Sequence, residues 1–146
     1  MDWKTMAIDD LREYNARRQS LEILPMQIAE IDAEMTGIRS SGNMASVSVS
    51  GGSGSREDVL ISRMVKKEKL QRNLDRAKLW VRFMDKGLAA LTEDERHILD
   101  RFYINPAKGN VDRLCEELFV EKTALYKRKD AALRKFTVAL YGCAES

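Results

Sequence analysis

The sequence is poor in the residues that build catalytic and metal centres. It has two cysteines and a single histidine among 146 residues. Cys115 and Cys143 lie far apart, in a pattern typical neither of a zinc site nor of a disulfide framework. His97 has no nucleophile beside it and no second imidazole with which to share a metal ion. We therefore expect no enzymatic activity, no cofactor and no metal site, and we predict that both thiols are buried and reduced.

Long apolar runs are also missing. No stretch approaches the roughly 18 apolar residues that cross a membrane. The N-terminal sequence MDWKTMAIDDLREYNARR carries charges throughout, unlike the apolar core of a signal peptide. A chain that is 44% hydrophobic and 33% charged, with only two prolines, suits a helix-rich protein. These features predict an all-α, cytoplasmic protein with no membrane partner.

One segment, residues 37–55, breaks the composition of the chain. Glycine and serine dominate it and its apolar periodicity disappears, which is typical of a flexible linker. On its N-terminal side, apolar residues recur at steps of three and four, which predicts a helix over residues 4–36. Pro25 lies inside this pattern. Because proline removes a backbone donor, we expect a kink or a break near Leu24.

Beyond the linker, a heptad pattern predicts a second helix over residues 56–90. Its apolar positions follow steps of four and three. They are Leu70, Leu74, Ala77, Val81, Met84, Leu88 and Leu91.

The heptad pattern fails upstream of Leu70. Arg63 and Lys67 occupy seam positions there, and the apolar residues lie off the seam. These displaced residues are Ile61, Met64 and Val65. The apolar face is therefore expected to shift by about a third of a turn, on the helical period of 3.6 residues.

The two helices are expected to bury their stripes against each other as a long, coiled-coil-like antiparallel hairpin over residues 1–90, within one chain or across a dimer. Residues 1–55 have five basic and eight acidic side chains, whereas residues 56–91 have ten basic and five acidic ones. Opposite charges favour the pairing, but burial must dominate because an exposed ion pair contributes at most about 1 kcal/mol. Alternatively, the positive second helix faces nucleic acid.

Residues 91–146 read as a second domain of three helices, over residues 92–104, 110–118 and 122–141. Thr92 and Glu95 fit a capping box. The loop sequence NPAKGN then ends this first helix, and Asn110 is expected to cap the next one.

The last two helices have the pattern of a helix-turn-helix. In this motif, a short helix and a tight turn precede a longer helix that enters the major groove of DNA. From Lys122 to Lys135 the chain has six basic residues against one acid. Each lysine or arginine that contacts phosphate releases condensed counterions and adds affinity. The charge of this segment therefore indicates DNA binding.

A family resemblance agrees with this interpretation. LTEDERHILDRFY followed by VDRLCEELFVEKTALYKRKDAALRKF resembles the region-four helix-turn-helix of bacterial sigma factors, over about residues 91–136. With the long N-terminal helices, the linker and the ending AALRKFTVALYG, the whole chain is similar to phage-encoded ArpU/RinA-type transcriptional regulators. The resemblance implies a regulator that activates phage late genes in the cytoplasm of the bacterial host. Double-stranded DNA is the implied partner, with RNA polymerase and a second copy of the chain as candidate partners.

The resemblance also implies roles for individual residues. Cys115 would lie where the two helices cross and Val120 would be buried in the turn. The inner face of the recognition helix would consist of Leu125, Ala132 and Leu133. The predicted DNA-binding residues are Asn110, Lys122, Thr123, Tyr126, Lys127, Arg128, Lys129 and Arg134.

Three positions depart from the sigma-factor pattern. Phe119 stands where the turn usually has glycine, and Glu121 stands where a serine or threonine cap is usual. Arg128 takes a position that is usually apolar. These departures bear on the geometry of the turn and on the register of base contacts.

Two other functions fit the same residues. One is the DNA-recognition small subunit of a phage packaging terminase, which would assemble into a ring. The other is a helical adaptor that does not bind DNA. Assembly size and DNA affinity separate these alternatives from a transcriptional regulator.

Overall fold

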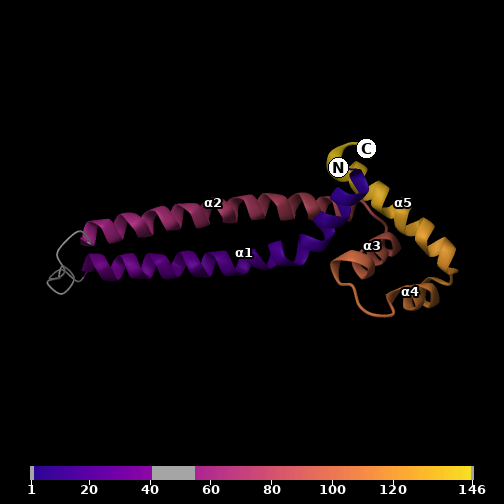
Figure 1. Ribbon diagram of the computed structural model, residues 1–146, viewed down its shortest axis with the longest axis horizontal. Coiled ribbons are helices and arrows are strands. Elements are labelled where there is room, and N and C mark those ends of the chain that lie inside the picture. The colour runs from indigo at the N-terminus through magenta and orange to yellow at the C-terminus, as the bar shows by residue number, and fades with distance from the viewer. Residues whose placement is uncertain (1, 41–54, 146) are drawn as a thin grey trace. The chain divides into compact units, whose positions relative to one another are not determined.

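The computed structural model describes residues 2–40 and 55–145 (Figure 1). Its elements in chain order are α1 (Trp3–Ser40), α2 (Arg56–Ala89), α3 (Glu93–Leu99), the π-helical segment η2 (Asp100–Ile104), α4 (Asn110–Leu118) and α5 (Lys122–Tyr141). The described residues contain no strand, so the predicted all-α fold class is confirmed. Within the same residues, no helix has the length and apolar character that crossing a membrane requires.

The chain divides into two compact units, and each long helix contributes to both. The hairpin unit is Arg18–Lys78, and the terminal unit combines Met1–Arg17 with Leu79–Ser146. This division differs from the predicted boundary at residue 90. The reason is that the start of α1 and the end of α2 pack with the C-terminal helices. Such contacts join residues that are far apart in the chain, so no local sequence pattern predicts them.

Both long helices begin at a side-chain cap. The Asp2 carboxylate accepts a hydrogen bond from the Thr5 backbone N–H at 2.8 Å, and this bond lowers the pKa of Asp2. The Ser55 hydroxyl accepts one from the Asp58 backbone N–H at 3.2 Å. Asp58 also places negative charge in the first turn of α2, where the helix dipole favours it.

Helix α1 continues through Pro25 to Ser40, so of the two outcomes predicted near Leu24, a kink or a break, the break is wrong. The proline removes one helical hydrogen bond. This loss is offset because the helix on its C-terminal side buries a regular apolar stripe. That stripe is Ile28, Ile31 and Met35. The first residues of the predicted linker, up to Ser40, are also helical, and residues 41–54 lie outside the described part of the chain.

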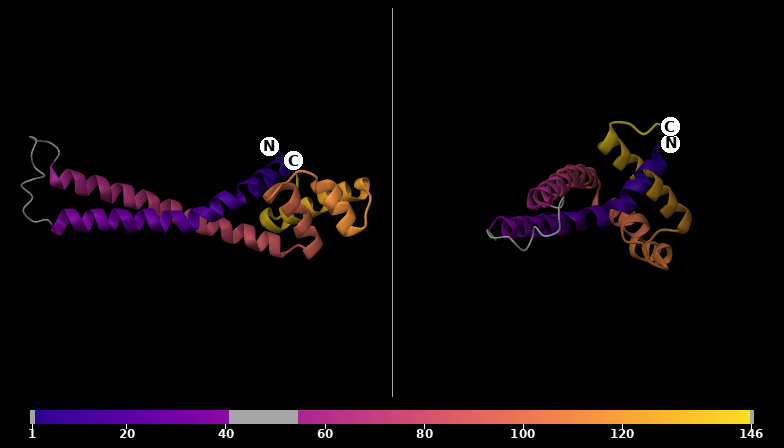
Figure 2. Two further views of the ribbon diagram at one scale, coloured as in Figure 1. Left: turned by 90° about the horizontal axis from the view of Figure 1, so that it is seen from below. Right: turned by 60° about the vertical axis from the view of Figure 1, so that its left-hand side comes forward.

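In the hairpin unit, α1 and α2 lie side by side and antiparallel (Figures 1 and 2). Two ion pairs join them. The Arg63 Nε lies 2.8 Å from the Glu34 Oε2, and the Lys67 Nζ lies 2.6 Å from the Asp32 Oδ1. All four side chains are partly exposed, so each pair contributes at most about 1 kcal/mol. Pairing of the two helices within one chain is therefore shown.

These ion pairs correct the predicted shift of the apolar face. Arg63 and Lys67 keep the seam positions of α2 and reach across to α1. The displaced apolar residues stay exposed instead of turning inward; they are Ile61, Met64 and Val65. Arginine and lysine can occupy a seam because their aliphatic stems cover apolar surface while their charged ends reach carboxylates.

The terminal unit has the larger core. The heptad positions of α2 that lie in this unit are all buried, as are the inner positions of α3 and α5. The buried residues of α2 and the following loop are Val81, Met84, Leu88 and Leu91. Gly87 lets α2 approach α5 closely, because a Cβ at this position would lie 3.1 Å from the Phe136 ring.

Hydrogen bonds hold the start of α1 within the terminal unit. The Tyr141 hydroxyl donates to the Asp10 carboxylate, and the Tyr14 hydroxyl donates to Asp85. The Asn15 amide donates to the backbone oxygen of Ile104 at 3.1 Å. Partial burial, followed by the bond to Asp10, raises the pKa of Tyr141 to about 12. Burial likewise raises the pKa of Asp10.

Replacing Leu74 by Asp tests the packing of the hairpin unit. Leu74 is buried, so an aspartate there places an unpaired charge among apolar side chains. We expect a loss of about 3 kcal/mol or more in the free energy of unfolding, measured by urea denaturation with circular dichroism. Gln71→Asp is the matched control because Gln71 is exposed on the same helix. Equal stability of the two variants would show that α2 does not bury this face.

The Tyr141–Asp10 bond predicts a dependence of stability on alkaline pH. The folded protein holds the tyrosine proton to about pH 12, whereas an unfolded tyrosine ionises near its usual pKa of 10.0. The bond therefore stabilises the fold fully below pH 10 and is lost as pH rises from 10 to 12. Tyr141→Phe should cost about 1 kcal/mol at pH 8, and this difference from the parent should shrink above pH 10.

Urea denaturation from pH 8 to pH 12 measures this effect. Tyr126→Phe is the control, because within the described part of the chain its hydroxyl makes no hydrogen bond. A difference between Tyr141→Phe and the parent that stays constant across this range would contradict the assignment.

Candidate nucleic-acid interface

Helices α4 and α5 pack around a small apolar cluster with α3. Ile98, Leu114 and Leu125 are buried at its centre. The partly buried residues around it are Phe102, Val111, Cys115, Leu118 and Val120. The inner face predicted for α5 is confirmed: Leu125, Ala132 and Leu133 are all buried. This packing orients the opposite face of α5 toward solvent.

The turn between the two helices has left-handed backbone geometry at Phe119. Its φ is 55° and its ψ is 47°. The backbone N–H groups of Phe119 and Val120 both donate to the carbonyl of Cys115, the latter at 3.1 Å. The turn therefore has the conformation that glycine adopts readily, although a phenylalanine occupies the position. For an L-residue this conformation costs about 1–2 kcal/mol, and 93% of the Phe119 surface is exposed.

The residue that precedes α5 gives little help to its first turn. Glu121 is extended, with φ −82° and ψ 161°, and its side chain makes no capping hydrogen bond. Its backbone oxygen accepts the Leu125 N–H at 2.9 Å. The first N–H groups of α5 thus have no side-chain cap, unlike those of α3, where Thr92 supplies one.

Asn110 does not cap α4, contrary to the prediction. Gly109 occupies the cap position with φ 80°, so Asn110 is the first helical residue. A cap residue normally has extended backbone geometry, and the left-handed Gly109 leaves no place for it. The Asn110 amide donates instead to the backbone oxygen of Arg101 at 2.5 Å. It ties η2 to the start of α4.

Three predicted DNA-binding residues share the outermost stripe of α5. Thr123, Lys127 and Arg134 are all exposed. Their spacing of four and seven residues points them from the same side of the helix. This stripe lies opposite the buried positions of α5.

A second pair of predicted residues lines a groove with the start of α4. Lys122 and Tyr126 form one wall, and Asn110 and Arg101 lie in the same groove. The Tyr126 ring packs edge-on against Phe102, with centroids 5.8 Å apart. Sequence reasoning missed Arg101. Its only signal was its positive charge, four positions before the loop NPAKGN.

Lys129 differs from the other predicted residues because it is held within the protein. Only 18% of its side chain is exposed. Its ammonium lies 5.0 Å from the centre of the Tyr126 ring and 5.3 Å from that of Phe102. The Asp130 carboxylate is 3.7 Å away. Lys129 therefore supports Tyr126 through cation–π contact and is not free to reach outward.

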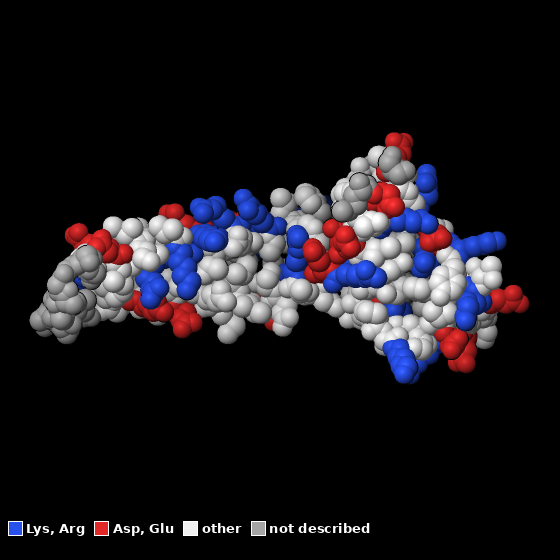
Figure 3. Space-filling model, in the orientation of Figure 1, with Lys and Arg blue, Asp and Glu red and all other residues white. Residues whose placement is uncertain are grey.

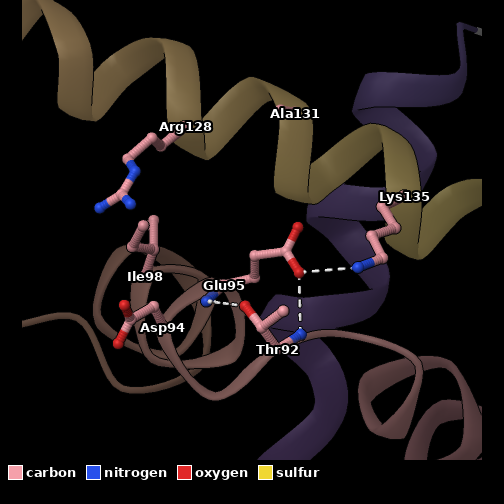
Figure 4. A pocket seen from close by; sticks show the side chains of 7 residues that line it. All are labelled: Thr92, Asp94, Glu95, Ile98, Arg128, Ala131 and Lys135. Carbon is pink, nitrogen blue, oxygen red and sulfur yellow. Dashed lines mark hydrogen bonds and ion pairs between the residues drawn. The ribbon is translucent and has the colours of Figure 1, made fainter.

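Arg128 and Lys135 belong to the face of α5 that turns toward α3. The Glu95 Oε1 accepts hydrogen bonds from the Thr92 backbone N–H at 2.8 Å and from the Lys135 Nζ at 2.9 Å (Figure 4). The Thr92 bond, followed by those from Lys135, lowers the pKa of Glu95. Arg128 extends toward Ile98 in the same view. The predicted capping box is thus confirmed, and it also fastens α5 to α3.

Acidic side chains dominate the other side of the turn. Glu116, Glu117 and Glu121 are exposed around Phe119. Glu117 lies 2.6 Å from the His97 Nε2 and so links α4 to α3. Basic and acidic side chains are interspersed over the surface of the terminal unit in Figure 3. On the terminal unit, the exposed stripes of α5 and the groove at the start of α4 are the surfaces that suit a polyanion.

The two thiols correct the prediction that both are buried. Cys115 is half-buried in the cluster between α4 and α5, whereas Cys143 is exposed. Gly142 ends α5 with a φ of 87°, so Cys143 leaves the helical pattern that would have placed it. Both cysteines are unpaired.

The chain belongs to the family described as "Protein of unknown function (DUF1492)", which matches residues 38–137. The match includes α2, α3, η2, α4 and α5 as far as Thr137. No curated protein and no solved structure matches the chain.

Replacing Phe119 by Gly should stabilise the protein. Glycine adopts positive φ without the steric cost that Phe119 bears, although it also has more freedom in the unfolded chain. We expect a net gain of about 0.5–1 kcal/mol in the free energy of unfolding. Phe119→Ala is the control, because it removes the ring but keeps the Cβ that causes the strain. A glycine variant no more stable than the alanine variant would show that the turn is unstrained.

Proposed function

We propose that this chain is a sequence-specific regulator of transcription that binds double-stranded DNA and inserts α5 into the major groove. One observation carries the proposal. Helix α5 follows a tight turn, buries Leu125 and Leu133, and presents Thr123, Lys127 and Arg134 on the opposite stripe. A short helix, a turn and an exposed basic helix in this order are the parts of a DNA-reading helix-turn-helix.

The exposed residues divide into two groups by their place on α5. Thr123 and Lys127 are in the first two turns, which meet base edges in this motif. Arg134 lies two turns further on and contacts phosphate. The groove with Lys122 and Arg101 provides further phosphate contacts beside the start of α4, which fix the register of the protein on the duplex.

Within this scheme, Asn110, Tyr126 and Lys129 are mainly positioning residues. Asn110 holds the Arg101 backbone, and Lys129 holds the Tyr126 ring. The Tyr126 side chain is still 40% exposed, so its ring edge reaches a thymine methyl group or a phosphate. Arg128 lies toward α3 and contributes long-range attraction to the phosphates.

The specific role in transcription follows from the sequence resemblance to phage regulators. It supports an activator of late genes that acts in the bacterial cytoplasm and contacts RNA polymerase. Two outcomes would replace this role. A large ring that binds DNA would favour the terminase small subunit, and the absence of any DNA affinity would favour the helical adaptor.

Selection of bound duplexes from random DNA, followed by two alanine variants, tests the proposal. Lys127→Ala should cost about 1–3 kcal/mol on the selected duplex and relax its sequence preference. Arg134→Ala should weaken binding to selected and scrambled duplexes alike and reduce the salt dependence by about one unit. Binding would be measured by fluorescence anisotropy across a salt series.

Lys69→Ala is the matched control, since Lys69 is an exposed basic residue of α2. It should bind both duplexes as the parent does. If Lys127→Ala behaves like the parent, the assignment of α5 as the recognition helix is wrong. If Lys69→Ala loses as much affinity as the α5 variants, DNA lies along α2 instead.

A further inference from the structure

An apolar patch lies on the outer face of α2 in the hairpin unit. Ile61 is 57% exposed and Val65 is 59% exposed. They lie one turn apart, and they face away from α1 because the intervening Arg63 and the following Lys67 form the ion pairs with it. Met64, which is 44% exposed, lies beside them. Met64 also lines a groove with Met35 of α1, so the more exposed Ile61 and Val65 form the centre of the patch.

A pair of helices leaves such a patch without an internal partner. The described core of the hairpin unit has few buried apolar residues, namely Ile28, Ile31, Met35 and Leu74. A helix needs an apolar stripe on one side only to form a hairpin. A second stripe on the opposite side of α2 is what two hairpins bury when they form a four-helix arrangement.

Two charges of opposite sign flank the patch at equal distances along α2. On the same stripe of α2, Asp58 precedes Val65 by seven residues and Arg72 follows it by seven. Seven residues make about two turns, so all three point from one side of the helix. Within the described part of the chain, neither Asp58 nor Arg72 forms an ion pair. Glu68 lies three residues after Val65, and the uncharged Ser62 lies three residues before it.

We propose that this outer face of α2, from Asp58 to Arg72, is a self-association surface and that its partner is a second, antiparallel copy of this chain. A two-fold axis near Val65 brings the Val65 side chains of the two copies together. It also places Asp58 of each copy against Arg72 of the other. The same patch then serves both copies, as two-fold symmetry requires.

The charge pattern favours this occupant over others. A parallel copy would place Asp58 against its own equivalent, and like charges in contact are destabilising. A nucleic acid would meet Asp58 at one end and apolar side chains at the centre. An antiparallel copy places Asp58 against Arg72 and Val65 against Val65. Ile61 then packs on the aliphatic stem of Lys69 of the other copy. This inference concerns the hairpin unit and does not depend on DNA binding.

Sedimentation equilibrium of the full chain without DNA tests the proposal, with Val65→Asp as the first variant. The parent should be dimeric at micromolar concentration. Val65→Asp should be monomeric with unchanged helical content, because Val65 lies on the side of α2 opposite the ion pairs with α1. Leu79→Asp is the matched control, since Leu79 is an exposed apolar residue of α2 outside the patch. It should remain dimeric. A monomeric parent, or a dimeric Val65→Asp variant, would overturn the proposal.

Charge reversal tests the antiparallel register. Asp58→Arg and Arg72→Asp each disrupt two symmetric pairs and should raise the dissociation constant about tenfold. The double variant restores both pairs with opposite polarity and should recover the affinity of the parent. If the single variants dimerise normally, or if the double variant is the weakest, the antiparallel arrangement is wrong.

Discussion

The terminal unit depends on the burial of one side of α5. Leu125, Leu133 and Phe136 pack inward against α3, α4 and the backbone of α2 at Gly87. Because these positions recur every three or four residues, their burial also decides which side of the helix meets solvent. The exposed stripe with Lys127 and Arg134 follows from this packing. A basic surface is thus a consequence of the core beneath it.

The turn before α5 retains strain that a different residue would relieve. Phe119 adopts a conformation suited to glycine, and its ring is almost fully exposed, so no packing within the described residues offsets the cost. The acidic side chains beside it distinguish this side of the turn from the basic stripes of α5.

In part of the hairpin unit, charged residues pair α1 with α2 at seam positions that apolar residues occupy elsewhere. Arg63 and Lys67 bridge to acids of α1, so the pairing of the two helices continues where the heptad pattern loses its apolar residues. The displaced apolar side chains then lie on the outside of α2. The failure of the heptad pattern upstream of Leu70 predicted a shift of the apolar face, because charged residues are usually absent from a coiled-coil seam. Long basic side chains remove that incompatibility.

Local interactions were sufficient for the sequence by itself to determine the helices. The capping box at Thr92 and Glu95 predicted the start of α3. The apolar periodicity and the loop residues predicted α4 and α5 at the observed bounds, since these signals act within a few residues. Tertiary structure alone decided the division into units, because Asp10 and Tyr141 meet across almost the whole chain. It also decided which basic residues of α5 are available. Lys127 and Lys129 are alike in sequence terms, but the rings of Phe102 and Tyr126 hold only Lys129, and that contact arises from the packing of η2 beside α5.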